Sequence, residues 1–149
     1  MSSGKSFDFK SFVAADPGRR ISALDYLHAV YRFEGLPDDF VLLFAKMFWP
    51  DFKVVEGLVY LSHMFDLERY QELLNEGRKA SEAQFWMNLT EITWVFDELS
   101  SDDAMIIAKA LSKTWNAKMA SDFGEISTPA RAIHDDETGE VFVTIGAHD

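Results

Sequence analysis

His28 is the first side chain in this sequence whose chemistry could matter. An imidazole titrates near neutral pH, so it can act as a general base or bind a metal ion. Helical spacing places His28 on one face with Leu24 and Tyr31. No second histidine lies at a useful metal-binding spacing. We therefore favour an imidazole at the edge of the core, held by a backbone or aspartate partner, over a catalytic or metal-binding group.

A second candidate set, Glu56, Tyr60 and His63, has spacings that would place all three side chains on one helical face. A carboxylate and an imidazole there could bind a metal ion. However, only two of the three are strong ligands, and the His-Glu-x-x-His motif is missing. We expect the polar side of an amphipathic helix, and we predict no metal ion and no other cofactor.

The sequence contains no cysteine, which excludes disulfide bonds, thiolate catalysis and zinc-thiolate sites. Its eight glycines are scattered and form no phosphate-binding loop. The serines lie at expected helix caps and not in a nucleophile elbow. We predict no catalytic residue and favour a non-enzymatic protein.

Two acidic clusters offer a different chemistry, the binding of a basic partner. Their members are Asp97, Glu98, Asp102 and Asp103 in the first cluster, and Asp135, Asp136, Glu137 and Glu140 in the second. Neither cluster has the alternating ligands and central glycine of a calcium-binding loop. Both have an ordinary explanation as well, because acidic residues favour helix N-termini and solvated turns. The candidate partner-binding residues among them are Asp97, Glu98, Asp135, Asp136 and Glu137.

Met87 and Trp94 should share one side of an expected helix whose other side is already apolar. That other side carries the row Phe85, Leu89, Ile92, Phe96 and Leu99. Either both sides of the helix are buried, or Met87 and Trp94 contact a partner. We favour burial and keep the partner contact as the alternative.

The net charge of −11 repels phosphate backbones, so we expect no nucleic acid partner and instead attraction to basic proteins. The most apolar run, 40–49, is about half as long as a bilayer span and contains Lys46. No apolar stretch near the N-terminus resembles a secretory signal. We predict a soluble cytoplasmic protein that does not bind membranes.

Helix start and stop signals divide residues 21–120 into six expected helices. Ser22 and Asp25 form a capping box, and Ser81–Gln84 resembles another. The run 40–49 is apolar nearly all round, which is typical of a helix buried in the centre of a bundle. Residues 52–65 could contain a strand over 53–62, but their helical apolar stripe is longer, so we predict a helix. The last two helices should carry the apolar rows Phe85–Leu99, behind the capping box at 81–84, and Ala104–Met119, with Gly124 closing the second.

The period of the apolar residues changes near the C-terminus, where 130–134 and 140–145 alternate around an acidic turn that ends in Gly139. This pattern predicts a β-hairpin within 126–146. Residues 1–6 should form a flexible tail. Residues 7–20, with three phenylalanines, should form a docking arm that is a strand or irregular and could add a third strand to the hairpin. The expected fold is a mainly α single domain, 1–149, with a helical core over 21–120.

Two function hypotheses follow. The first is a small acidic, non-enzymatic protein that binds another protein, or itself, through an apolar surface ringed by carboxylates. The alternative is a small-molecule or enzymatic pocket between helices, with His28 or His63 as its titrating group. The expected pocket residues are His28, Tyr31, His63, Trp86 and Trp115.

Overall fold

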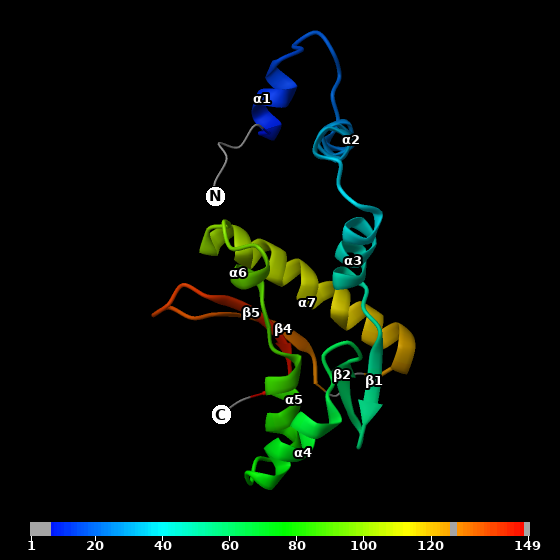
Figure 1. The fold of residues 1–149 in the computed structure, drawn as a ribbon, viewed down its shortest axis with the longest axis vertical. Coiled ribbons are helices and arrows are strands. Elements are labelled where there is room, and N and C mark those ends of the chain that lie inside the picture. Colours follow the sequence, from blue (N-terminus) through cyan, green and yellow to red (C-terminus); the bar gives the residue numbers. More distant parts are fainter. Residues whose placement is uncertain (1–6, 126–127, 148–149) are drawn as a thin grey trace. The chain divides into compact units, whose positions relative to one another are not determined.

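The computed structural model describes residues 7–125 and 128–147, and the chain divides into two units, Met1–Leu43 and Phe44–Asp149. The described residues form seven helices and five strands, and the strands belong to two small antiparallel sheets (Figure 1). Helices make up 53% of the described residues. This is a mixed α+β fold, so the prediction of a mainly α bundle with a single hairpin is wrong. The expected tail 1–6 lies outside the described residues.

The first unit contains α1 (Phe9–Ala14), α2 (Ala23–Glu34) and the beginning of α3 (Asp38–Phe48). The carboxylate of Asp8 caps α1 by accepting a hydrogen bond of 2.9 Å from the Ser11 N–H. The expectation of a strand or an irregular arm is therefore wrong over 9–14, where the chain is helical, whereas 15–20 contains no helix or strand.

α2 begins at the predicted capping box. The Asp25 carboxylate accepts the Ser22 N–H at 2.8 Å, and Ser22 Oγ accepts the Asp25 N–H at 3.3 Å. The helix ends at Gly35, which adopts a left-handed conformation with φ of 62°. Local signals thus determine both ends of α2.

Aromatic rings join α1 to α2. Tyr26 meets Phe9 and Phe12 edge-on at centroid distances of 5.4 and 5.3 Å. On a different face of α2, Leu24 and Leu27 are exposed. Neither α1, α2 nor α3 contains a buried residue, so the prediction that the 40–49 helix is buried at the centre of a bundle is wrong.

In the second unit, the end of α3 is followed by a hairpin of β1 (Phe52–Val55) and β2 (Leu58–Leu61), where a helix over 52–65 is predicted. Its two-residue turn is Glu56 and Gly57, with φ of 50° and 84°. Two positive φ values match the right-handed twist of the strands. The β-branched residues on either side of the turn favour a strand. The helix predicted over 52–65 from the helical spacing of its apolar residues is therefore wrong.

α4 (Leu67–Asn75) follows, capped by Asp66 as expected from the sequence. Its residues Tyr70 and Leu73 are buried in the smaller of two core clusters. The other members of that cluster, from β2 and α5, are Tyr60, Ala83 and Met87.

The predicted helix over 81–99 is broken into α5 (Ala80–Asn88), β3 (Thr90–Glu91) and α6 (Ile92–Val95). The cause is tertiary. The Asn88 side chain accepts the Leu61 N–H at 2.9 Å and donates to the Val59 and Ile145 carbonyls at 3.1 and 3.4 Å. The backbone after Asn88 then pairs with a strand, which a continuing helix would prevent. α5 also starts earlier than expected, since Glu82 accepts the Lys79 N–H and not that of a serine cap.

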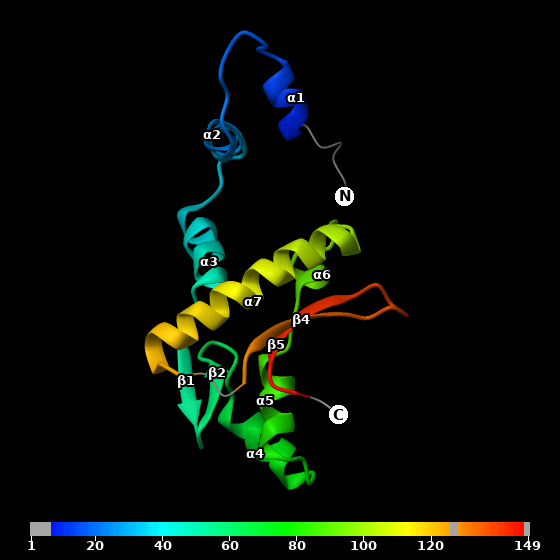
Figure 2. The same ribbon diagram turned by 180° about the vertical axis from the view of Figure 1, so that it is seen from behind.

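α7 (Ser101–Phe123) agrees with the predicted last helix, and its expected apolar row is buried. That row is Ala104, Ala108, Leu111, Trp115 and Met119. The helix lies along a three-stranded sheet of order β3-β5-β4 (Figures 1 and 2). The sheet contains the predicted hairpin, β4 (Ala130–His134) and β5 (Val141–Ile145), in which Ala132 faces Val143. Its third strand is β3 and not the phenylalanine arm. No described helix combines the length and the apolar character that a membrane span requires.

Candidate functional site

Two segments that are distant in sequence meet at the N-terminal end of α7. Ser101 Oγ donates a hydrogen bond of 2.6 Å to the Gly139 carbonyl, and the Val141 N–H donates one of 3.2 Å to Thr93 Oγ1. The segment 91–103 therefore lies against the β4–β5 turn, 135–140. We call these two segments together the acidic end.

The two segments of the acidic end contain no lysine or arginine of their own to balance their carboxylates. Residues 91–108 contain five carboxylates, and residues 132–147 contain four; neither stretch contains lysine or arginine. The hydrogen bond between Ser101 and Gly139 brings both predicted acidic clusters to one place. Such a surface carries a negative potential that attracts cations and basic proteins.

Some of these carboxylates have structural roles. Asp135 accepts the N–H groups of Glu137 and Thr138 within the turn, and Asp136 lies 2.9 Å from His134 Nδ1. Others make no hydrogen bond and no ion pair with any described residue: Asp97, Glu98, Asp102 and Glu137. These side chains are available to a partner.

Trp94 and Met87 do not form the expected stripe, because the helix ends between them. Met87 is 6% exposed and packs in the smaller core cluster. Trp94 in α6 is 76% exposed. It is followed closely in the chain by the exposed Asp97 and Glu98. The structure thus places Trp94, but not Met87, at the acidic end.

A pocket of about 340 Å³ lies beside α4 and α5. It is lined by Met64, Arg69, Leu73, Arg78, Trp86 and Met87, which we call the arginine pocket. Trp86 is an expected pocket residue, and Met87 is an expected partner contact. The two arginines come from α4 and from the loop that follows it, so no local spacing in the sequence points to them. The one sequence signal that could have drawn attention to Arg69 and Arg78 is that they are basic residues in an acidic chain.

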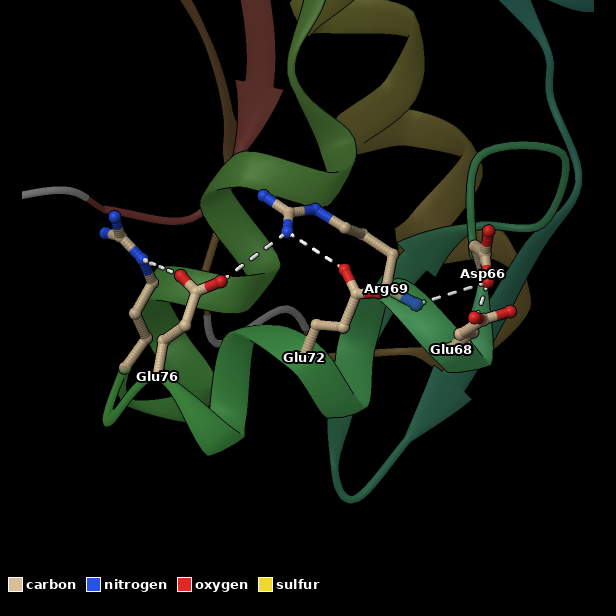
Figure 3. A network of polar contacts seen from close by, with 6 residues as sticks. Asp66, Glu68, Arg69, Glu72 and Glu76 are labelled. Atoms are coloured by element: carbon tan, nitrogen blue, oxygen red, sulfur yellow. Dashed lines mark hydrogen bonds and ion pairs between the residues drawn. The ribbon is translucent and has the colours of Figure 1, made fainter.

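Figure 3 shows the guanidinium group of Arg69 between the carboxylates of Glu72 and Glu76. Arg69 Nη1 lies 3.3 Å from Glu72 Oε2 and 3.9 Å from Glu76 Oε2. The other oxygen of Glu76 lies 3.7 Å from Arg78 Nε. One carboxylate is therefore shared by the two arginines. The guanidinium of Arg78 also lies 5.9 Å from the ring centroid of Trp86.

The remaining expected pocket residues lie elsewhere. His28 is exposed on α2, and Tyr31 Oη lies 3.5 Å from Asp38 Oδ1 within the first unit. Trp115 is buried in the larger core cluster, where its Nε1 donates to the Met47 carbonyl at 2.8 Å. These three side chains do not line the arginine pocket.

His63 does not line the arginine pocket either, and its expected partners point to different places. Tyr60 is buried, whereas Glu56 lies in the β1–β2 turn and accepts the Tyr70 hydroxyl at 2.8 Å. Partial desolvation lowers the pKa of the His63 imidazole. Across 7–125 and 128–147, no three histidine or acidic side chains converge as metal ligands would.

Both the acidic end and the arginine pocket are suited to binding. Within the acidic end, Thr93 Oγ1 also donates a hydrogen bond of 2.9 Å to Glu91 Oε2. Comparison of the chain with protein-family models, with curated proteins and with solved structures finds no match.

Proposed function

We propose that the protein is a non-enzymatic interaction protein of the cytoplasm that binds a basic protein through the acidic end, with Trp94 as the apolar anchor. The observation that carries this proposal is a tryptophan 76% exposed beside two acidic segments that contain no lysine or arginine. Tryptophan is highly buried on average and is enriched among the residues that dominate binding energy.

The charge selects the kind of partner. Several carboxylates of the acidic end have no partner among the described residues, so their mutual repulsion is a cost that a cationic surface would relieve. Lysine and arginine side chains of a basic protein supply such cations, and an apolar residue between them would cover Trp94. A polyanion such as nucleic acid would be repelled.

The proposal can be tested with an amphipathic lysine- and arginine-rich peptide as the probe, titrated by calorimetry. We expect saturable binding that weakens as salt is raised, since screening acts over about 8 Å at physiological ionic strength. Trp94→Ala should weaken binding about ten-fold. Leu67→Ala is the control, because Leu67 is also an exposed apolar residue but lies on α4, outside both segments of the acidic end.

Charge reversal provides a second arm. Glu98→Lys should weaken binding of the peptide more than Glu34→Lys, an exposed position on α2. If the peptide does not bind, or if both reversals and both apolar truncations have equal effects, the acidic end is not a specific docking surface and the proposal fails.

A second candidate function is self-association through α2 and α3. The observation that favours it is that Leu24, Leu27, Leu42 and Leu43 each expose at least 60% of their surface on helices that contain no buried residue. Exposed apolar area of this extent is typical of interfaces between chains. Light scattering after gel filtration should then show a dimer that Leu27→Glu dissociates and the control Leu67→Glu does not. A monomer at every concentration would exclude this candidate.

A further inference from the structure

The arginine pocket has an apolar base and an aromatic wall. Leu73 and Met87, which are 2% and 6% exposed, belong to the smaller core cluster and form its base. Trp86 and Met64 are more exposed and form its walls. A volume of about 340 Å³ lies at the lower end of the range for small-molecule sites, so the pocket suits a small ligand with a single ring.

Two guanidinium groups accompany this apolar base, and most of their donors make no hydrogen bond with the described part of the chain. Each guanidinium carries five N–H donors in a planar fork. The only hydrogen bond that either makes with a described residue is that of Arg69 Nη1 to Glu72. The other ion pairs, to Glu76 and Glu82, span 3.7 to 3.9 Å, which is too long for a hydrogen bond.

Glu76 demonstrates that a single carboxylate can lie between Arg69 and Arg78. Its side chain is about half exposed, and it is attached at the C-terminal end of α4. Solvent-exposed ion pairs of this kind contribute little to stability. A carboxylate that is not tethered to α4 can approach both guanidinium groups more closely than Glu76 does. It can then form short, bidentate hydrogen bonds. Displacing Glu76 would therefore cost little and would leave Glu76 in water.

We propose that the arginine pocket binds a monovalent carboxylate attached to an aromatic or branched apolar group, with the carboxylate between Arg69 and Arg78 and the apolar group against Trp86, Leu73 and Met87. A dianion such as a phosphate is disfavoured, because three glutamates lie close to the two arginines. An uncharged apolar body would leave the guanidinium donors unused. This site is distinct from the acidic end, and its existence does not depend on the proposed function.

The same chemistry is present in a free aromatic acid and in the C-terminal residue of a peptide. The probes are therefore N-acetylphenylalanine and a short peptide that ends in phenylalanine. Each is compared with its C-terminal amide, which keeps the ring and removes the charge. Binding is followed by tryptophan fluorescence and by the amide NMR signals of residues 64–87. We expect saturable binding of both acids, about ten-fold stronger than that of the amides. Binding of the peptide acid alone would assign the site to peptide C-termini, and binding of the free acid alone would assign it to small molecules.

Variants make the test sharper. Arg78→Gln and Arg69→Gln should each weaken binding of the acid, whereas Arg32→Gln, an exposed position on α2, should not. Glu76→Gln should strengthen binding, because it removes the charge that competes for both arginines. A gain of affinity cannot result from misfolding, so this variant stays informative even if an arginine variant unfolds. Equal binding of acid and amide, no saturable binding, or unchanged affinity in Glu76→Gln would overturn the proposal.

Discussion

Tyr70 lies edge-on to Tyr60 with ring centroids 5.9 Å apart, and the two hydroxyl groups have opposite environments. Tyr70 Oη donates a hydrogen bond of 2.8 Å to Glu56 Oε2. Tyr60 Oη is buried and has no hydrogen-bond partner among the described residues. Burial, with smaller contributions from the nearby Tyr70 and Glu56, raises the pKa of Tyr60 to about 12. The smaller core cluster therefore contains one satisfied phenol and one unsatisfied phenol.

The two tyrosines predict opposite effects of the same substitution. Tyr60→Phe removes a buried polar atom that has no partner, so it should raise the free energy of unfolding by about 1 kcal/mol. Tyr70→Phe removes a hydrogen bond and should lower that free energy by about 1 kcal/mol. Urea denaturation of both variants beside the wild type measures the difference. A Tyr60→Phe variant less stable than Tyr70→Phe would show that this account of the cluster is wrong.

Substitution of Asn88 should cause a larger loss of stability. Its buried side chain makes three hydrogen bonds, to the backbones of Val59, Leu61 and Ile145. Asn88→Ala leaves these backbone groups without their partner and should lower the free energy of unfolding by about 3 kcal/mol. The control is Asn75→Ala at the exposed end of α4, which should change it by less than about 0.5 kcal/mol. Similar midpoints of thermal unfolding for both variants would contradict the role assigned to Asn88.

Gly146 predicts a steric effect where β5 approaches α5. A Cβ atom at this position would lie 2.8 Å from the backbone nitrogen of Phe85, and φ of Gly146 is 123°. Gly146→Ala should therefore cost about 2 kcal/mol of stability, because both the contact and the backbone angle disfavour a side chain. Gly18→Ala is the matched control, since its Cβ would meet no atom within 4 Å. The prediction fails if chemical denaturation gives the two alanine variants the same stability.

His63 predicts a dependence of stability on pH. Desolvation lowers the pKa of its imidazole in the folded protein, so the unfolded chain binds the proton more readily. The folded state is thus unaffected by His63 above the ordinary pKa of about 6.5 and loses stability as pH falls below it. Between pH 7.5 and pH 5.5, His63→Gln should lose less stability than the wild type, and the difference should grow as pH falls below about 6.5. An identical pH profile for wild type and variant, measured by denaturation at each pH, would refute the assignment.

Elements with complete local signals could be predicted from the sequence. The capping box of Ser22 and Asp25 and the left-handed Gly35 determine α2, and the buried row of α7 follows one helical period for about four turns. The C-terminal hairpin also follows from its alternation and its acidic turn ending in Gly139. In each case the residues that decide the structure are neighbours in the chain.

The secondary-structure predictions were wrong where contacts between residues distant in the sequence determine the structure. Nothing near Asn88 in the sequence indicates that its side chain hydrogen-bonds to β2 and β5, which stops α5 and separates Met87 from Trp94. The turn at Glu56 and Gly57 lacks the Asn-Gly or Asp-Gly signature of a two-residue hairpin. Glutamate rarely adopts a positive φ, so the local sequence does not indicate this turn. The two acidic clusters could be found in the sequence, but their meeting depends on the hydrogen bond between Ser101 and Gly139.

The absence of any buried residue in α2 determines where a protease would act first. A helix of twelve residues that buries none of them is marginal in water, so its hydrogen bonds open at little cost in free energy. The peptide bonds around Leu24, Leu27 and Phe33 then become accessible to an enzyme that cleaves after large apolar residues. Those of α7, whose apolar row is fully enclosed, become accessible only when the second unit unfolds. A ligand or chain that covers α2 would therefore reveal itself as a longer lifetime under chymotrypsin.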